Sequence, residues 1–532
     1  MSEKQEVHVD QDQEVTGTVN DDGEVVIQDK KWSADKTASS SDQNPPIPPS
    51  SEEQVVKTAA GTIVPPTAAK DDPEVIKTVE EFEKAAIAQI DDEEYWDDLM
   101  ERGKLLKLIE TPFQAPLGDD LFGSIRKNNI EQVEKLLTEG GEDPNQRNAN
   151  GSYGMHFACI GNHLNIAKLL RKHGAAANVF NKAGLTPLHC SCDVSSSIKL
   201  CNWLVAEGAD VNARSQTGKT PLHCCSLQGF ADIAQWLLHK GARINEETED
   251  GTQPIHFACH SGNLSLVQLL VDHGALLGCV NKSGETPFMW ACASGHLDIV
   301  LYMQQKWQEL AAKGGDEEEV EGGGVDPLAC GIHGHNALHY ATQGGHIDVV
   351  VQLIQMGLDV NSPDSEQGTP LHGACLKGFM PVVEYLVDTA GADINVKTSQ
   401  GVSVLHRACD GGNVEVLEYL CDKGMVPSER DAEKRTPLHY AAYRGHIHII
   451  EWILDNFENS ELLLKSSNMR GSNCLHIACQ KGQFKLAKYL VAHGVPVNSQ
   501  NNTGNTPFHF ACENGHIKLA KWLSENGAKL WV

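Results

Sequence analysis

A large apolar residue followed by histidine recurs along this chain at nearly constant intervals. Successive histidines are separated by 33, 34, 33, 33, 50, 33, 34, 33, 37 and 33 residues, counting Met289 as the member that lacks histidine. Such a period predicts a solenoid of stacked units, so the usual expectation of several globular domains in 532 residues does not apply. The histidines of the series are His156, His189, His223, His256, His339, His372, His406, His439, His476 and His509.

Each unit contains the signals for two short helices. In one example, Thr220 can cap a helix that has Pro221 at its first position, where the missing N–H costs nothing. Gly229 can end that helix in the left-handed conformation, and apolar residues at helical spacing over 233–238 predict a second helix that stops at Gly241. Neither helix can bury its apolar stripe alone, whereas stacked neighbours can.

These units resemble the ankyrin repeat, whose Thr-Pro-Leu-His signature stands at Thr186–His189, Thr220–His223, Thr369–His372 and Thr436–His439. The resemblance covers residues 117–532 and includes a divergent first unit that begins near Leu121. It implies an all-α solenoid of about twelve helix-turn-helix repeats with protruding turns, in which the recurring histidine bonds neighbouring turns and the inner face binds proteins.

Two steps of the repeat are longer than the rest. The 50-residue step contains an insertion at about 311–330, and the acidic, glycine-rich run over 314–324 predicts a flexible loop there. The 37-residue step adds four residues near 459–465, which we interpret as a longer turn.

The region before the repeats differs in composition. Residues 1–72 are rich in acidic residues, serine, threonine and proline, which predicts a disordered acidic tail. Residues 73–115 contain apolar side chains at helical spacing, and this amphipathic segment either caps the first repeat or docks elsewhere. Residues 1–115 carry 27 acidic and 11 basic side chains, and the whole chain has a net charge of −29. This balance argues against nucleic acid and anionic lipid as partners.

Targeting signals and disulfide patterns are also absent from the sequence. No apolar run follows a basic stretch in residues 1–30, and no segment is long and apolar enough to span a membrane. We therefore expect a cytoplasmic protein, with the nucleus as the alternative, whose sixteen cysteines remain free thiols.

Histidine and cysteine are abundant, yet their positions favour packing over chemistry. Eight cysteines lie three residues after the motif histidine or Met289, in a slot that holds alanine at Ala442. Cys330, His333 and His335 lie outside this register and could contribute zinc ligands, but no fourth ligand is evident. We therefore expect no metal or other cofactor. No phosphate-binding loop, nucleophile elbow or metalloprotease helix occurs, so we expect no enzyme activity; the alternative is an activity within residues 73–115.

The resemblance places the inner face on the turn tips, on the residue before Thr-Pro and at the end of the first helix. In the later repeats these positions are basic or aromatic, which suits a protein interface. We therefore predict a partner-binding surface for acidic protein segments, formed by Leu376, Lys377, Arg407, Arg435, Tyr443, Arg444, Arg470 and Lys481.

Three hypotheses follow for this protein. It is a non-catalytic scaffold or adaptor, or a regulatory subunit of an enzyme complex whose own acidic segment at 91–98 competes for the binding surface. It is also a possible substrate, because turn asparagines after valine or isoleucine resemble those that asparaginyl hydroxylases modify. These are Asn212, Asn245, Asn361, Asn395 and Asn498.

Overall fold

The computed structural model describes residues 120–194, 197–312, 326, 329–458 and 460–529, together with four short strands before them. The chain divides into two compact units, Met1–Gln114 and Ala115–Val532. In the first unit, β1 (Val15–Val19) pairs antiparallel with β2 (Val25–Asp29), and β3 (Val56–Lys57) with β4 (Ile63–Val64). The sequence did not predict these strands. The expected disorder over the rest of 1–72 and the expected helix over 73–115 lie outside the described residues.

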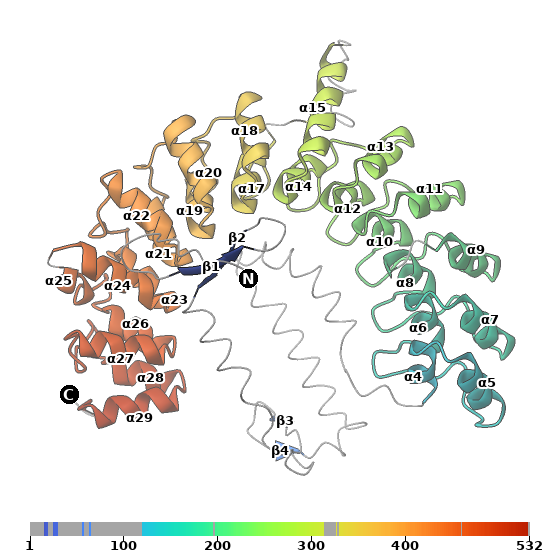
Figure 1. Cartoon of the computed structure of the whole chain (residues 1–532), viewed down its shortest axis with the longest axis horizontal. Helices are drawn as coiled ribbons and strands as arrows, with labels where there is room; N and C mark the ends of the chain where they lie inside the picture. The colour runs from blue at the N-terminus through green and yellow to red at the C-terminus, as the bar shows by residue number, and fades with distance from the viewer. Residues whose placement is uncertain are drawn as a thin grey trace. The chain divides into compact units, whose positions relative to one another are not determined.

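The second unit is a stack of twelve helix pairs, which confirms the predicted all-α ankyrin solenoid. Figure 1 shows the first helix of every pair on one side of the stack and the second helix on the other. The first helices are α4 (Leu121–Arg126), α6 (Gly154–Ile160), α8 (Pro187–Val194), α10 (Pro221–Leu227), α12 (Pro254–Ser261), α14 (Pro287–Ser294), α17 (Ala337–Gly344), α19 (Pro370–Lys377), α21 (Val404–Gly411), α23 (Pro437–Arg444), α26 (Cys474–Gln480) and α28 (Pro507–Glu513).

The second helices complete repeats 1 to 12 in the same order. They are α5 (Ile130–Thr138), α7 (Leu164–Lys172), α9 (Ile198–Ala206), α11 (Ala231–His239), α13 (Leu264–Asp272), α15 (Leu297–Ala312), α18 (Ile347–Gln355), α20 (Met380–Glu384) with the π-helix η1 (Tyr385–Thr389), α22 (Val414–Asp422), α24 (Ile447–Asn456), α27 (Phe484–Ala492) and α29 (Ile517–Glu525).

The two longer steps alter the second helices that precede them. Helix α15 has 16 residues where most second helices have nine, so the beginning of the expected loop at 311–330 is helical. Residues 313–325, 327 and 328 lie outside the described residues. The four extra residues of the 37-residue step belong to a region that contains α25 (Ser460–Leu464), a short helix with Leu464 fully buried. The connection is therefore more than a longer turn, because it contains one helical turn that places Leu464 in the core and leaves Leu462 exposed.

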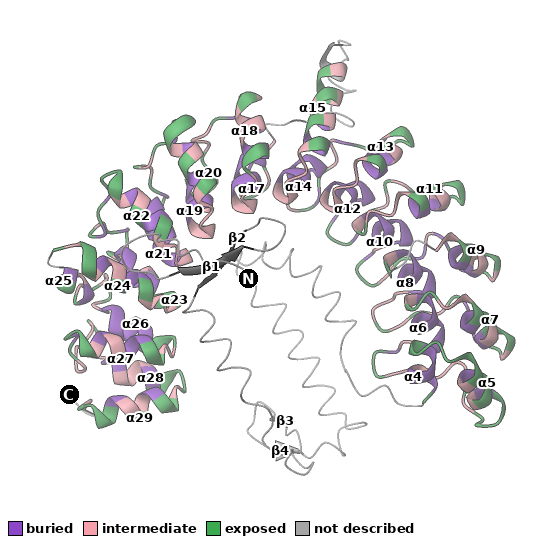
Figure 2. Cartoon of the chain, in the orientation of Figure 1, coloured by how far each residue is buried: buried purple, intermediate pink, exposed green. Residues whose placement is uncertain are grey.

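The core is continuous from one repeat to the next. Figure 2 shows buried residues concentrated where the helices of neighbouring repeats meet, while the loops are mostly exposed. The cysteine slot lies in this core: its members at positions 159, 192, 259, 292, 375, 409 and 479 are buried, and only Cys512 of the last repeat is exposed. These thiols therefore act as small apolar groups that fit between helices.

The motif histidine joins eight of the repeats to the next one. Nδ1 of His223 accepts the backbone N–H of Thr220 at 3.0 Å and lies 2.8 Å from its hydroxyl, which completes the helix cap. Nε2 reaches the carbonyl oxygen of Thr252 in the following repeat at 3.2 Å. Because Nδ1 is an acceptor, Nε2 carries the proton and donates. The same pair of contacts recurs at His156, His189, His256, His339, His372, His406 and His476.

Two further sets of hydrogen bonds connect the repeats, and the sequence did not reveal them. The turn tips form a ladder in which one backbone N–H per repeat donates to the preceding tip, from Lys182 N–H to Asn150 O at 3.1 Å through Asn502 N–H to Arg470 O at 3.0 Å. Just before the second helix of a repeat, a histidine or asparagine side chain donates to a carbonyl at the end of the first helix of the preceding repeat, as His296 Nε2 does to His260 O at 2.9 Å. Asn263, His346, Asn413, His446 and His516 make the equivalent bond.

Candidate protein-binding surface

The eight residues predicted to bind a partner lie on first helices, on the turns before them or, for Lys481, directly after one, in repeats 8 to 11. Tyr443, Arg444, Arg470 and Lys481 are exposed, and the other four are partly buried. We call this set the basic surface. Its members are Leu376 and Lys377 at the end of α19, Arg407 in α21, Arg435 before α23, Tyr443 and Arg444 at the end of α23, Arg470 in the next turn and Lys481 after α26.

Arg435 is held in place by a buried carboxylate. Its Nε donates to Asp431 Oδ2 at 2.6 Å, and the carboxylate is inaccessible to solvent. The Tyr440 hydroxyl donates to the same oxygen at 2.8 Å, and the Arg435 guanidinium lies 4.9 Å from the centre of the Tyr440 ring. Burial alone would raise the pKa of Asp431, but the hydrogen bonds from Arg435 and Tyr440 outweigh it and hold that pKa below its usual value.

Arg444 is anchored in a similar way at the other end of α23. Its Nε donates to Asp410 Oδ1 at 3.0 Å, and the side chain of Asp410 is only 6% exposed. Beside it, the Tyr443 ring contacts two cations: Lys481 Nζ lies 4.0 Å from the ring centre, and the Arg444 guanidinium lies 5.8 Å from it. These three side chains form one cation–π cluster across repeats 10 and 11.

The remaining members of the basic surface are more dispersed. Lys377 and Leu376 belong to repeat 8 and Arg407 to repeat 9. Arg470 lies in the turn-tip ladder, where its carbonyl accepts Asn502 N–H. The structure thus brings together four of the eight residues on or beside α23; of the other four, Lys377, Arg407 and Arg470 extend the positive charge over neighbouring repeats, and Leu376 is apolar.

Sequence reasoning missed the acidic and aromatic partners of these arginines. Asp431 stands four residues before Arg435, and Tyr440 directly follows the motif histidine, where repeats 2, 5, 6, 7 and 12 also carry an aromatic residue. These positions are visible in the sequence, but Asp410 comes from the preceding repeat, 34 residues away from Arg444. Only the stacked geometry shows this last pairing.

A second polar and aromatic cluster, also not predicted, spans the 50-residue step. Glu285 is 2% exposed and accepts hydrogen bonds from Trp290 Nε1 at 3.0 Å, Tyr340 at 3.2 Å and Asn281 at 2.7 Å. Tyr340 belongs to the repeat after the insertion, so this carboxylate connects repeats 6 and 7. Its bonds from Asn281 and Trp290 lie within repeat 6 itself.

The residues outside the histidine register take structural positions as well. His335 Nε2 lies 3.3 Å from Asp364 Oδ2, and its ring stacks on His339. Cys330 is exposed and forms a β-bridge with Asn336 through the backbone. Within the part of the chain that the structure describes, no three potential ligands converge on a metal position.

Four of the five turn asparagines bond to the next repeat. Asn212 Nδ2 donates to Gly241 O at 3.0 Å, and Asn212 Oδ1 accepts Arg243 N–H at 2.9 Å. Asn395 instead bonds to Asp393 of its own turn. The other three that reach across are Asn245, Asn361 and Asn498.

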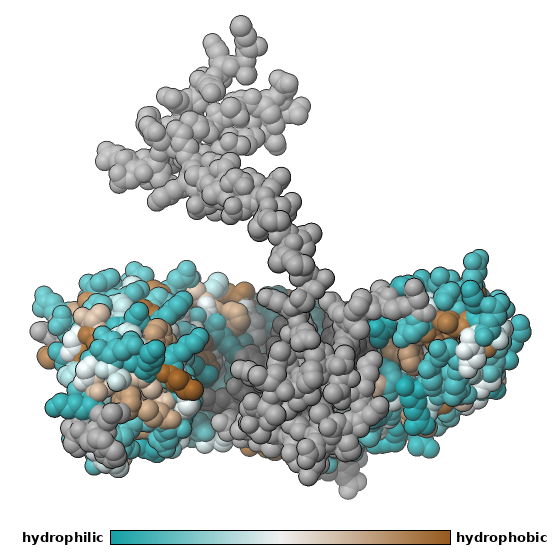
Figure 3. Space-filling view, turned by 90° about the horizontal axis from the view of Figure 1, so that it is seen from below, coloured by the Kyte–Doolittle hydropathy of each residue, from teal (hydrophilic) through white to brown (hydrophobic). Residues whose placement is uncertain are grey.

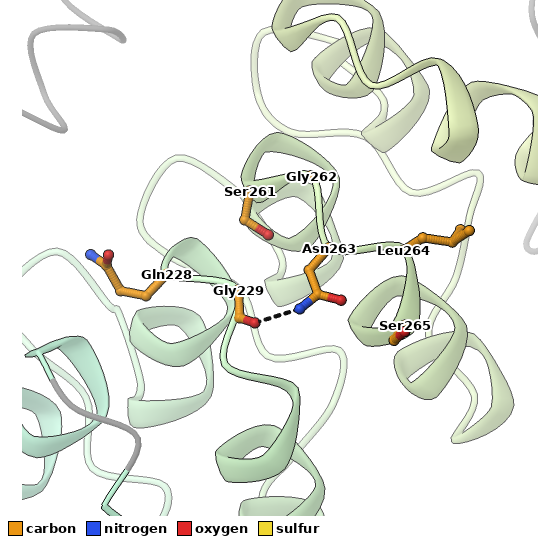
Figure 4. A pocket seen from close by; sticks show the side chains of 7 residues that line it. All are labelled: Gln228, Gly229, Ser261, Gly262, Asn263, Leu264 and Ser265. Atoms are coloured by element: carbon orange, nitrogen blue, oxygen red, sulfur yellow. Dashed lines mark hydrogen bonds between the residues drawn. The ribbon is translucent and has the colours of Figure 1, made fainter.

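A shallow depression lies between repeats 4 and 5, away from the basic surface. Figure 4 shows it at the end of α10 and the start of α13, where Asn263 Nδ2 donates to Gly229 O at 2.7 Å. Its volume is about 350 Å³. The depression is lined by Gln228, Gly229, Ser261, Gly262, Asn263, Leu264 and Ser265. None of these side chains is charged, so the depression offers no counter-ion for an acidic partner.

The surface that Figure 3 presents is mainly hydrophilic, with small hydrophobic patches among the described residues. No helix in the described ranges is both long enough and apolar enough to cross a bilayer.

Comparisons with known proteins agree with this architecture. The family model "Ankyrin repeats (3 copies)" matches residues 121–215, 194–248, 242–313, 309–398, 390–462 and 456–532. The chain is 33% identical over 79 residues to NF-kappa-B inhibitor alpha of Homo sapiens, which is 14% of this chain and 25% of that protein. It is 37% identical over 51 residues to protein phosphatase 1 regulatory subunit 27 of Homo sapiens, which is 10% of this chain and 33% of that protein.

A palmitoyltransferase of Lachancea kluyveri is 27% identical over 164 residues, which is 30% of this chain and 22% of the relative. The chain therefore matches a third or less of the length of each of these relatives. From the match over 121–532 and this geometry, the chain belongs to the ankyrin repeat family.

Proposed function

We propose that this protein is a non-catalytic scaffold or adaptor that binds acidic segments of partner proteins on the basic surface. The observation that carries the proposal is the pair of anchored arginines on α23, Arg435 and Arg444, each held through Nε by a buried aspartate. A side chain that is already ordered loses less entropy when a partner binds, so more of the interaction energy appears as affinity.

The family and the relatives support the same class of function. Ankyrin repeats are protein-interaction modules, and two of the relatives are by name an inhibitor and a regulatory subunit. We place the protein in the cytoplasm or nucleus, because all sixteen of its cysteines are free thiols, as a reducing compartment would keep them.

The test is affinity capture from cells of the source organism with the full-length chain and with a Lys481→Glu, Arg470→Glu variant. Both side chains are exposed, so the fold should persist. We expect acidic partners to be lost from the variant and to be released by salt from the natural protein. An unchanged set of partners with unchanged salt dependence would refute the proposal.

A regulatory subunit whose own tail competes for the basic surface is the second candidate. Its support is the acidic run at 91–94, 97 and 98, which is covalently linked to the repeats and therefore present at high effective concentration. That run lies outside the described residues. Deletion of residues 1–115 should tighten partner binding, whereas deletion of 1–72 should leave it unchanged. Equal affinity in all three proteins would remove this candidate.

A further inference from the structure

The second helices of repeats 11 and 12 expose a face that combines lysines with large apolar side chains. Helix α27 begins with Phe484 and Lys485, and α29 begins with Ile517 and Lys518, so the same pattern returns after 33 residues. Ile517 is 79% exposed and Phe484 is 36% exposed. We call this set the lysine face, and all its members are exposed: Phe484, Lys485, Lys488, Ile517, Lys518 and Lys521.

Contacts between the two helices show that these residues share one face. The lysines occupy the second and fifth positions of each helix, which are neighbours on the same side. The Phe484 ring lies 6.0 Å from the Trp522 ring of the next repeat, and Lys488 Nζ lies 5.5 Å from the centre of the Phe484 ring. Among the described residues, no ion pair joins any of the four lysines to a carboxylate. The face therefore keeps its positive charge beside apolar groups that water covers.

The same two helix positions carry the opposite charge in the repeats before this face. In α22 they hold Glu415 and Glu418, and in α24 they hold His448 and Glu451. The three glutamates are exposed, and we call them the glutamate face. Figure 1 shows α22, α24, α27 and α29 following one another towards the C-terminus. Along this side of the stack, the sign of the charge thus changes between repeats 10 and 11.

A surface with this order of charges is complementary to itself. A two-fold axis between repeats 10 and 11 would bring repeat 11 against repeat 10 of a second copy, and repeat 12 against its repeat 9. Lysines would then meet glutamates on both sides of the axis. We propose that a second copy of this chain docks on the lysine face through its own glutamate face and forms an antiparallel dimer, in which Phe484 and Ile517 lose their contact with water.

The size of the face sets the strength of this dimer. Neighbouring helices pack about 8–10 Å apart and a nine-residue helix is about 13 Å long, so four helices cover on the order of 500 Å² per copy. Both copies together bury about 1,000 Å², which is near the lower limit for a specific interface. The net charge of −29 also repels a second copy, although at about 0.1 M salt this repulsion is screened beyond about 10 Å. We therefore expect a weak dimer that depends on salt.

This inference goes beyond the proposed function. The basic surface lies on first helices and their turns, whereas the lysine face and the glutamate face lie on second helices. Docking of a second copy therefore leaves the basic surface uncovered. A dimer presents two basic surfaces, so a partner with two acidic segments gains affinity from the second contact at high effective concentration.

The experiment measures the mass of the full-length protein by sedimentation velocity over a range of concentrations. We expect a dimer that forms with rising concentration at about 0.1 M salt and weakens at about 1 M salt. The double variant Lys518→Glu, Lys521→Glu gives repeat 12 the charge of repeat 9 and should raise the dimer Kd by about tenfold or more. The double variant Glu415→Lys, Glu418→Lys should do the same from the opposite side.

An equimolar mixture of these two variants tests the pairing itself. In a mixed dimer, the reversed repeat 12 meets the reversed repeat 9, and the two unaltered repeats meet on the other side of the axis. Opposite charges then face each other at both contacts, so the mixture should dimerise although neither variant does so alone. Recovery of the dimer also shows that both variants are folded.

The matched control reverses two exposed lysines on the second helix of another repeat. Lys168→Glu, Lys172→Glu in α7 changes the net charge by the same amount, and Lys168 occupies the fifth position of its helix as Lys521 does. This control should leave the dimer Kd unchanged.

Three results would each overturn the inference. The first is a natural protein that stays monomeric at every concentration, and the second is a mixture of the two reversed variants that stays monomeric. The third is a control variant that weakens the dimer as much as the Lys518→Glu, Lys521→Glu variant, because net charge alone would then govern association. None of these results bears on the basic surface, which the Lys481→Glu, Arg470→Glu variant tests separately.

Discussion

Lowering the pH from 7 to 5 should destabilise the stack through its motif histidines. In eight of the ten, as in His223, Nδ1 accepts a backbone N–H and Nε2 donates to the next repeat, so the neutral ring satisfies both contacts. A second proton on Nδ1 would face an N–H donor in a buried site. Burial lowers the pKa of His223 from 6.5 to about 3, and it lowers to about 4 those of His156, His189, His256, His339, His372, His406 and His439.

The direction of the effect follows from proton binding. Because the folded pKa lies below the unfolded value of 6.5, the unfolded chain binds more protons between pH 6.5 and pH 4. This contribution to stability is therefore complete above pH 6.5 and is lost as the pH falls towards 4. At pH 5 each such histidine costs on the order of 2 kcal/mol of unfolding free energy, so even a few of them together lower the stability noticeably.

The assay is urea unfolding followed by circular dichroism at pH 7, 6 and 5, a window above the range where carboxylates titrate. We expect the midpoint to fall steeply with pH. The matched variant is His223→Met, which imitates Met289, where the Thr286 hydroxyl accepts the Met289 N–H at 3.2 Å and completes the cap without a ring. The unfolding free energy of this variant at pH 7 should be lower than that of the natural protein. Its unfolding should take up one proton fewer, so its unfolding free energy should change less with pH. A midpoint that stays constant from pH 7 to pH 5 would refute the reasoning.

Three further predictions test the packing of the stack. Asn212→Ala removes two hydrogen bonds to the next repeat and should lower the unfolding free energy by about 1–2 kcal/mol. Asn395→Ala removes a bond within its own turn and should lower it less. Equal losses of unfolding free energy in urea would contradict this prediction. In the native protein, a thiol reagent should modify the exposed Cys330 and Cys512 rapidly and the buried thiols only after denaturation. Rapid labelling of all sixteen cysteines would contradict the burial of these thiols in the core. Gly411→Ala places a methyl group against the backbone of the preceding repeat and should lower the unfolding free energy by more than about 2 kcal/mol. An unchanged melting temperature would contradict this, because the neighbouring backbone would then have moved to make room for the methyl group.

The histidine period determined the register, the number of repeats and the core. Twelve helix pairs follow from it because each unit carries the same cap, helix stop and apolar spacing, and local signals of this kind act within a few residues. The period also removed most cysteines from the list of reactive groups, since Cys159 and Cys375 fall into the same slot as Ala442 and are buried there. Where the sequence left the period, prediction failed in part: α25 places Leu464 in the core, and α15 continues as a helix to Ala312.

The basic surface shows the same division between local and tertiary information. Its eight residues could be chosen from their positions in the repeat, but their arrangement could not. Asp410 and Arg444 are 34 residues apart, and Lys481 reaches Tyr443 from the next repeat, so these contacts depend on how far and at what angle one repeat stacks on another. The sequence alone therefore determined which side chains face the same way, because that depends on helix periodicity. Only the tertiary structure decided which cations are anchored and which aromatic rings support them, because those contacts join residues that the chain keeps far apart.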